Sequence, residues 1–197
     1  MNLLVNRLVP LALPLLAMAA CSKSEDKSAD MVTSDAYSSR YQPLPAVATI
    51  LKGATVLTGT GERLETADVV MEGGLIVAVG QDLDPAGRLE VDAGNMWVTP
   101  GVIDVHSHLG AYPSPGVTAH SDGNEATDPN TAEVWVEHSV WPQDPGFVAA
   151  LAGGVTSLQI LPGSANLFGG RGITLKNVPG RSVMDMKFPG DPVRSSG

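Results

Sequence analysis

The sequence has almost no cysteine. Cys21 is the only one among 197 residues, so no disulfide bond can form within the chain. Upstream of it, Arg7 precedes an apolar run over residues 8–17, and small residues follow. That order is typical of a secretory signal peptide, and the apolar run is too short to be a good membrane span. The sequence therefore predicts a signal peptide over residues 1–21.

The position of Cys21 directly after Ala-Met-Ala-Ala resembles the lipobox of bacterial lipoproteins. In that family the cysteine is lipidated and becomes the mature N-terminus. A lipobox prefers leucine where Met18 stands, and an ordinary signal peptide with a nearby cysteine is the alternative. The resemblance implies lipidation at Cys21 and an exported protein, anchored by lipid on the periplasmic side of a bacterial membrane. Ser22 at the next position favours the outer membrane.

Positive charge is also scarce. Twelve lysines and arginines stand against 21 aspartates and glutamates, which gives a net charge of -9. The basic residues form no cluster, and an acidic surface repels phosphates. These observations exclude nucleic acid as a partner. Hydrophobic residues make up 43% of the chain, so we expect most of it to fold.

Two segments follow the predicted signal peptide. Residues 22–45 are rich in Ser, Asp and Lys and have no apolar periodicity, which predicts a flexible linker. Residues 46–98 contain short β-branched runs separated by glycine-rich turns, and Gly73-Gly74 is a two-residue hairpin signal. We expect about four antiparallel strands here, forming a small β-sandwich or part of one.

The pattern changes at Pro100-Gly101, and residues 99–197 form a second predicted domain. A strand over residues 102–108 is apolar without strict alternation, as in a strand buried on both faces. A loop rich in proline and glycine follows over residues 110–130, and then a short helix over residues 131–140.

A clear helix is predicted over residues 145–152. Asp144 can cap its N-terminus, Pro145 suits its first turn, and Gly153-Gly154 ends it. Further strands are expected over residues 155–161 and 173–177. This alternation of strands and a helix predicts a parallel α/β sheet.

Two histidines occupy alternate positions in the strand that follows Pro100-Gly101. Side chains alternate between the faces of a strand, so His106 and His108 point the same way, about 6–7 Å apart. Asp104 has the same parity. Two imidazoles at that spacing can share a metal ion, while a pair of hydrogen-bonded core or surface histidines is the alternative. No glutamate follows as in a cupin, and no Asp-His follows as in a metallo-β-lactamase.

The segment Val-Thr-Pro-Gly-Val-Ile-Asp-Val-His-Ser-His-Leu-Gly, residues 98–110, resembles the first barrel strand of the amidohydrolase superfamily. Residues 67–80 are similar to the sandwich hairpin of that superfamily, and Asp92 to Gly101 to the segment that follows it. Residues 147–176 are similar to the helix–strand unit of imidazolonepropionase-like members. The likeness covers roughly residues 48–190.

The resemblance implies the start of a TIM-like (β/α)₈ barrel preceded by a small β-sandwich, with a metal centre at the C-terminal ends of the barrel strands. It assigns His106 and His108 as ligands of one or two divalent metal ions, zinc in the common case. It implies hydrolysis of carbon–nitrogen bonds in a small molecule by a metal-activated water, with cyclic amides, amidines or peptide-like compounds as substrates.

The length departs from this pattern. Such a barrel needs about 250 residues, and 98 residues follow Thr99. The histidines and the aspartate that later strands contribute in the superfamily are therefore not expected in this chain. We interpret the sequence as an N-terminal portion that is inactive alone. The alternative function is a non-catalytic truncated lipoprotein or a ligand-binding module.

Other candidates for the site are weaker. Lys176 and its rival Lys187 are candidates for a carboxylated lysine that bridges two metal ions, against a solvated or salt-bridged lysine as the alternative. His120 and Arg171 are candidates for substrate binding, although His120, like His138, also fits a loop or surface histidine. The glycine-rich stretch over residues 163–172 lacks a Gly-Lys-Ser/Thr ending, which argues against a phosphate-binding P-loop.

Overall fold

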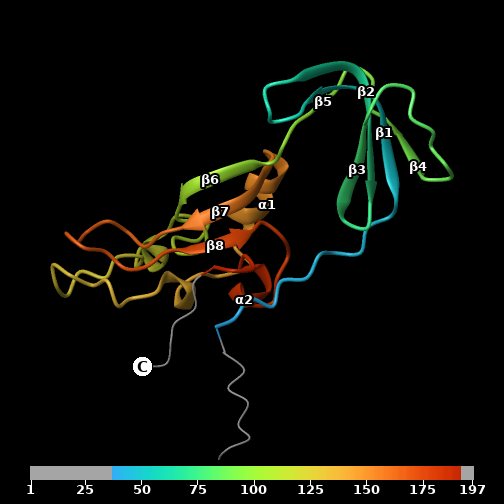
Figure 1. Cartoon of the computed structure of the whole chain (residues 1–197). Helices are drawn as coiled ribbons and strands as arrows, with labels where there is room; N and C mark the ends of the chain where they lie inside the picture. The colour runs from blue at the N-terminus through green and yellow to red at the C-terminus, as the bar shows by residue number, and fades with distance from the viewer. Residues whose placement is uncertain (1–36, 192–197) are drawn as a thin grey trace, which may run out of the picture. The chain divides into compact units, whose positions relative to one another are not determined.

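The computed structural model describes residues 37–191, which form a mixed α/β structure with two β-sheets (Figure 1). The predicted signal peptide, Cys21 and residues 22–36 of the predicted linker lie outside the described residues. Across residues 37–191, no helix is both long enough and apolar enough to cross a membrane.

The first sheet contains five strands. They are β1 (Thr49–Leu57), β2 (Arg63–Glu72), β3 (Leu75–Gly80), β4 (Leu89–Asp92) and β5 (Trp97–Val98). The strand order is β3-β2-β1-β4, and β5 also pairs with β1. One cluster of its buried side chains is small or β-branched, which suits close packing on a pleated surface: Ala54, Val56, Ala67, Val69 and Ala93.

Gly73 and Gly74 connect β2 to β3, and this confirms the predicted hairpin. Both residues have positive φ, 59° and 78°, as a type I′ turn requires. The two strands pair antiparallel from Glu72 opposite Leu75 to Asp68 opposite Gly80. The hairpin therefore forms at the turn that the sequence predicts.

The direction of β4 and β5 differs from the prediction, because both run parallel to β1 rather than antiparallel. After β3, the chain crosses to the far side of β1 through residues 81–88. A crossover of this kind leaves no local hairpin signal, because the paired strands are far apart in sequence. Residues 49–98 form one sheet, and no second layer of the predicted sandwich is present within them.

A bulge in β1 is held by the buried carboxylate of Asp68. The β1–β2 register shifts here, and Gly53 has a φ of 74°. Asp68 accepts hydrogen bonds from the Gly53 amide (2.9 Å), the Leu83 amide (3.0 Å) and the Lys52 ammonium (2.6 Å). Burial by itself raises the pKa of Asp68, but the bonds from Lys52 and the two amides outweigh it and lower the pKa.

The second sheet has the order β6-β7-β8. Its strands are β6 (Val102–Ser107), β7 (Val155–Ile160) and β8 (Ile173–Lys176). β6 and β7 are parallel and are connected through helix α1 (Pro145–Ala152), as predicted. The Asp144 side chain accepts a hydrogen bond from the Gly146 amide at 2.8 Å, which confirms the predicted N-cap.

β8 runs antiparallel to β7, so the predicted parallel arrangement is wrong for this strand. Residues 161–172 connect the two strands without a helix. A parallel connection needs a crossover, usually a helix, whereas antiparallel neighbours need only a returning loop. The glycine-rich loop over residues 163–172 is part of such a returning connection between the antiparallel strands β7 and β8.

The expected helix over residues 131–140 is much shorter in the structure. Only one turn of 3₁₀-helix, η3 (Val136–His138), forms in this segment, and another, η2 (Thr118–His120), lies in the preceding loop. Backbone bridges instead tie this segment to the glycine-rich loop, at Asn130 with Phe168 and at Trp135 with Arg171. These long-range bridges compete with helical hydrogen bonds for the same backbone groups.

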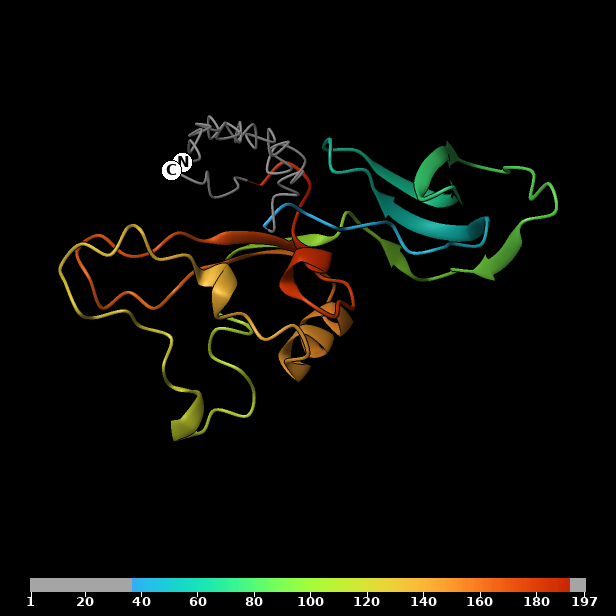
Figure 2. The ribbon, with the colours of Figure 1, turned by 90° about the horizontal axis from the view of Figure 1, so that it is seen from below.

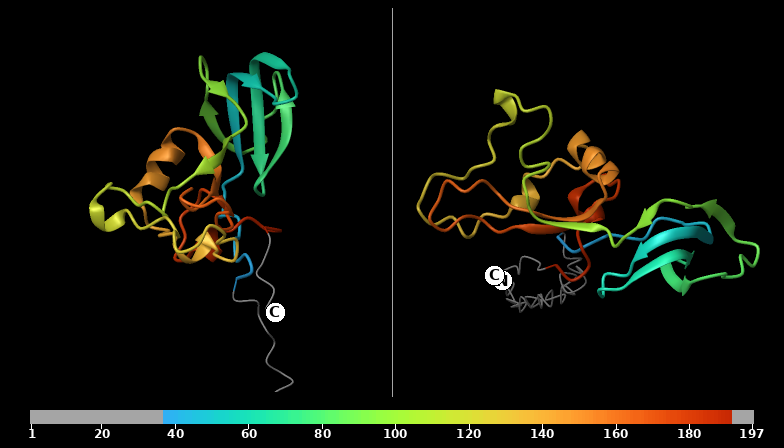
Figure 3. Two further views of the ribbon diagram at one scale, coloured as in Figure 1. Left: turned by 90° about the vertical axis from the view of Figure 1, so that its left-hand side faces the viewer. Right: turned by 90° about the horizontal axis from the view of Figure 1, so that it is seen from above.

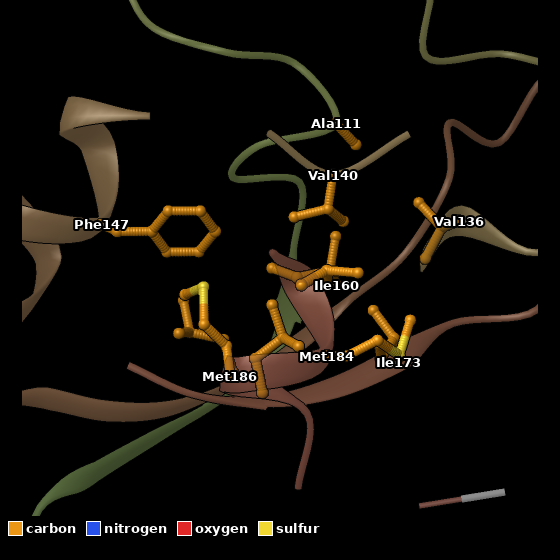
Figure 4. Close-up of a cluster of buried hydrophobic side chains, with 11 residues drawn as sticks. Ala111, Val136, Val140, Phe147, Ile160, Ile173, Met184 and Met186 are labelled. Carbon is orange, nitrogen blue, oxygen red and sulfur yellow. The ribbon is translucent and has the colours of Figure 1, made fainter. Parts of the chain in front are cut away.

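Helices α1 and α2 (Val183–Met186) lie on the same face of the β6-β7-β8 sheet (Figure 2). Phe147 from α1 and the two methionines of α2 pack against the side chains that β7 and β8 direct to this face (Figure 4). The buried cluster consists of Ala111, Val136, Val140, Phe147, Leu158, Ile160, Ile173, Leu175, Val183, Met184 and Met186. This core fixes the strand ends that bear the candidate site.

Residues 37–41 pack on α2 and on Lys187, the residue that follows it. The Arg40 amide donates to the Met184 carbonyl (2.8 Å), and the Ser39 hydroxyl donates to the Lys187 carbonyl (2.6 Å). The Lys187 ammonium in turn donates to the Tyr37 carbonyl at 3.0 Å. The sequence predicts a flexible linker over residues 22–45 and does not indicate these contacts, because they join positions about 150 residues apart.

Candidate functional site

The structure brings His106 and His108 together at the C-terminal end of β6. Their ring centroids are 5.3 Å apart, with an interplanar angle of 81°. Ser107, between them, is buried and lies opposite Ile160, whereas His106 is exposed. The strand therefore separates Ser107 from the two imidazoles, as the alternation of side chains requires.

The orientation of His108 is fixed by a hydrogen bond to the neighbouring strand. Its Nδ1 lies 2.8 Å from the carbonyl oxygen of Leu161, the residue directly after β7. A carbonyl only accepts, so Nδ1 carries the proton and donates it, and Nε2 is left as the atom with a free lone pair. A backbone carbonyl on the far nitrogen is the usual support of a metal-binding histidine.

The loop after His108 is held by Asp144, which is 1% exposed. One carboxylate oxygen accepts from the Gly110 amide (2.8 Å), and the other accepts from the amides of Ser114 (3.0 Å) and Gly146 (2.8 Å). The helix cap of α1 thus also orders the loop that follows the histidine pair. Sequence reasoning found the cap and missed the two loop contacts, which span 34 and 30 residues.

A pocket of about 520 Å³ opens beside His108. Its lining comes from the loop after β6, from the loop around residue 124 and from the glycine-rich loop after β7. The lining residues are His108, Tyr112, Asn124, Gly163, Ser164 and Ala165. The chain near residue 130 and the glycine-rich loop run side by side beyond the strand ends (Figure 3).

Tyr112 and Asn124 are the site residues that sequence reasoning missed. The Tyr112 ring makes an edge contact with the His108 ring at 5.6 Å. The only local signal is the pair of glycines that approach Tyr112, Gly123 and Gly163, and neither is distinguishable in sequence from an ordinary loop glycine.

The other predicted residues lie elsewhere, and none lines this pocket. The His120 ring bonds to the carbonyls of Pro113 and Pro115. Arg171 donates to the Ala132 carbonyl (2.9 Å) and stacks on Trp135. The remaining candidates also make contacts outside this pocket. Lys176 lies over the Phe188 ring, His138 makes an edge contact with the Tyr37 ring, and Asp104 accepts a hydrogen bond from the His106 amide.

Lys187 is fully buried and forms an ion pair with Glu137. Its Nζ lies 2.8 Å from Glu137 Oε2, and both side chains are at most 1% exposed. Two of its donors are thus committed, one to this carboxylate and one to the Tyr37 carbonyl. Among residues 37–191, no group of three or more His, Cys, Asp or Glu side chains could hold a metal ion.

The curated relatives of this chain agree in activity. The amidohydrolase tasK of Hapsidospora irregularis is 38% identical over 127 residues, which are 62% of this chain and 13% of that protein. A dihydroorotase of Lactobacillus gasseri is 45% identical over 83 residues, or 41% of this chain and 18% of that protein. An Escherichia coli allantoinase is 32% identical over 113 residues, or 57% and 19%. The relatives of this chain are therefore amidohydrolases.

A solved structure supports the same conclusion. An amidohydrolase from Thermotoga maritima MSB8 matches with a TM-score of 0.66 and 37% identity, over 72% of this chain and 37% of that chain. No protein-family model matches the sequence. The chain spans less than a fifth of the curated amidohydrolases named above and little more than a third of the solved one.

Proposed function

We propose that this chain is part of a metal-dependent, imidazolonepropionase-like amidohydrolase that hydrolyses carbon–nitrogen bonds in small cyclic amides, amidines or peptide-like compounds. The observation that carries the proposal is the pair His106–His108, in ring contact at a strand end with His108 held by Leu161. The likeness to the Thermotoga maritima amidohydrolase supports it. On this proposal, β6 is the first strand of a (β/α)₈ barrel, and β1 to β5 are part of a β-sandwich.

The donor set of the pair fits a divalent metal ion such as zinc. Imidazole nitrogen is a common zinc ligand, and the bond from His108 to Leu161 leaves Nε2 available. His106 is exposed on the same side. Two ligands are fewer than the three that a catalytic zinc site takes from protein, so the proposed site needs a further ligand that residues 37–191 do not group with this pair.

The metal, when bound, lowers the pKa of its water and polarises the group to be cleaved. His106 and His108 hold the ion, and Leu161 orients the imidazole of His108. Asp144 orders the loop that carries Tyr112 to the pocket. The pocket beside His108 receives the substrate, because His108, one member of the pair, lines it.

Metal titration tests the proposal directly. We expect the full chain to bind Co²⁺ or Zn²⁺, measured by cobalt absorption and by metal analysis after gel filtration. The double variant His106→Ala/His108→Ala is expected to bind the metal ion at least about tenfold more weakly, because both proposed ligands are removed. The matched variant His120→Ala/His138→Ala also removes two histidines but leaves His106 and His108 in place. It is expected to bind the metal ion as the wild type does. Equal metal binding by both double variants would exclude the pair as ligands.

We also propose that Cys21 is lipidated and anchors the exported protein to a bacterial membrane. The support is the sequence alone: the single cysteine follows an apolar leader and Ala-Met-Ala-Ala. Expression in a Gram-negative host with an alkyne fatty acid should label the wild type and leave Cys21→Ser unlabelled. Equal labelling of both would contradict the anchor.

A further inference from the structure

One Asp-Gly step occurs in the sequence, at Asp122-Gly123, and no Asn-Gly step does. The carboxyl carbon of an aspartate and the next backbone nitrogen can close a five-membered ring. A side chain on the following residue hinders this closure, and glycine has none. The chain can therefore react with itself more readily at this step than at its other aspartates.

Both reacting groups of this step are free in the structure. Asp122 is exposed, and within residues 37–191 neither its carboxylate nor the Gly123 amide makes a hydrogen bond. The step lies in an irregular segment, outside any helix or strand. The same two residues line a pocket of about 220 Å³, which is large enough to admit water.

Other aspartates of the described chain are held in place. Asp128, in the same loop, accepts a hydrogen bond from the Asn130 amide (2.9 Å) and is followed by a proline, which has no N–H. Asp82 accepts none, but the amide after it donates to Asp68 at 3.0 Å. Among residues 37–191, Asp122 is the only aspartate for which both the side chain and the following amide are unbonded.

Gly123 is also a point at which two loops meet beside His108. Its carbonyl accepts a hydrogen bond from the Gly163 amide at 2.8 Å. A side chain on Gly123 would overlap the Tyr112 ring, so the backbone is closely packed here. Tyr112 and Gly163 both line the pocket that His108 borders. A longer backbone between Asp122 and Gly123 would therefore displace the hydrogen bond, the ring or both.

We propose that Asp122-Gly123 is a self-modification site, at which the folded chain slowly converts the aspartyl linkage into an isoaspartyl linkage, and that this conversion loosens the two loops beside His108. The inference is independent of the proposed function, because neither a metal ion nor a substrate takes part in the reaction. It assigns a chemical role to a loop residue that the histidine pair does not use.

The conversion balances with water as the only co-reactant. The Gly123 nitrogen attacks Cγ of Asp122, so an N–Cγ bond forms, and the Cγ–O bond breaks as the amide hydrogen and the carboxyl hydroxyl leave as water. A second water molecule opens the resulting succinimide. Breaking its bond between nitrogen and the main-chain carbonyl carbon leaves the chain running through Cβ and Cγ, with one additional methylene group. Breaking the N–Cγ bond restores aspartate.

Incubation of the full chain at neutral pH, sampled over weeks, tests the proposal. A carboxyl methyltransferase specific for isoaspartate measures the product as methyl groups transferred from S-adenosylmethionine. The wild type is expected to gain methyl acceptance with time, up to one group per chain. Asp122→Glu keeps the charge but would need a larger ring, and is expected to stay at its starting level. Asp122→Asn should gain acceptance sooner, because an uncharged amide carbon is attacked more readily than a carboxylate.

A protease that cleaves before aspartate, and not before isoaspartate, locates the product. Digestion after unfolding is expected to lose cleavage before Asp122 in step with the methyl groups gained. Cleavage before Asp128, the matched control in the same loop, should remain complete. Hydrogen–deuterium exchange at the Gly163 amide should become faster in the converted chains and stay unchanged in Asp122→Glu, because only conversion displaces the Gly123 carbonyl.

Three outcomes would overturn the inference. If the folded wild type gains no methyl acceptance while the urea-unfolded chain does, the fold protects the step rather than permitting the reaction. Equal gains in the wild type and in Asp122→Glu would place the isoaspartate elsewhere. Unchanged exchange at the Gly163 amide in fully converted chains would refute the loosening of the two loops.

Discussion

In each sheet, one buried carboxylate fixes a local piece of backbone by accepting hydrogen bonds from backbone amides. Asp68 fixes the bulge of β1, and Asp144 fixes the loop after His108. Neither role is visible in sequence, because each carboxylate bonds to amides more than a dozen residues away. The histidine pair is different. Its position was predictable because the alternation of a strand is a local property, and the ring contact agrees with that prediction.

Asp68 gives a pH-dependent contribution to stability. Its pKa is lowered in the fold from an ordinary value of 3.8, so the stabilisation is present above that value and is lost as the pH falls through the lowered pKa. Asp68→Asn should lower the free energy of unfolding by about 1–3 kcal/mol at neutral pH, because buried amides lose a charged acceptor. Urea denaturation followed by circular dichroism should show this gap closing in strong acid. Glu90→Gln on exposed β4 should show no gap, and a constant gap for Asp68→Asn would refute the linkage.

Removing one member of the buried Lys187–Glu137 ion pair should lower the free energy of unfolding strongly, whereas replacing both members with apolar residues should lower it little. Glu137 Oε1 has no hydrogen-bonding partner among residues 37–191, so the pair is not fully compensated. Lys187→Met should lower the free energy of unfolding by about 3–5 kcal/mol, because it leaves a buried charge alone. The double variant Lys187→Met/Glu137→Leu should recover most of that loss in thermal denaturation. Arg63→Met, which breaks an exposed pair, should cost about 1 kcal/mol or less.

At the scale of the elements, prediction succeeded where the signal lies within the element. The helix over residues 145–152 carries its own cap and its own stop, and the hairpin carries Gly73-Gly74. Prediction failed for β4, β5 and β8, whose direction depends on how a connecting loop crosses the sheet. It also overestimated the helix over residues 131–140, where bridges to the glycine-rich loop take the backbone groups.

The hairpin turn should tolerate asparagine and reject a β-branched residue. Gly73 has a φ of 59°, a left-handed conformation that asparagine adopts with little strain. Gly73→Asn should leave the urea midpoint nearly unchanged, whereas Gly73→Val should lose about 1–3 kcal/mol. The two variants differ little in size, so equal midpoints would show that backbone conformation does not control this turn.

At the scale of the whole chain, the described residues leave much apolar surface exposed. Ile103 and Val105 in β6 are 66% and 70% exposed, and within residues 37–191 β6 pairs with β7 alone. An unpaired strand edge with apolar side chains is a template for association. The sequence identified the strand, but only the structure shows which of its side chains are uncovered.

Association of this chain should therefore depend on β6. Light scattering coupled to gel filtration should show a mass that rises with concentration for the 197-residue chain. Ile103→Lys/Val105→Lys should reduce that rise, because charge on a strand edge opposes pairing. Val117→Lys changes an exposed valine in a loop and serves as the control. A monomeric wild type at all concentrations would contradict the prediction.

The hydrogen bond from His108 to the Leu161 carbonyl couples the orientation of a proposed metal ligand to the pairing of β6 with the segment after β7. Leu161 also donates its amide to the Ser107 carbonyl at 2.9 Å, so one residue of the neighbouring segment closes the strand end and aims the imidazole. A metal ion that requires this orientation favours the closed strand pair by mass action. Zinc should then slow hydrogen–deuterium exchange at the Leu161 amide in the wild type and not in His108→Ala, which would make a backbone amide the reporter of an ion that it never touches.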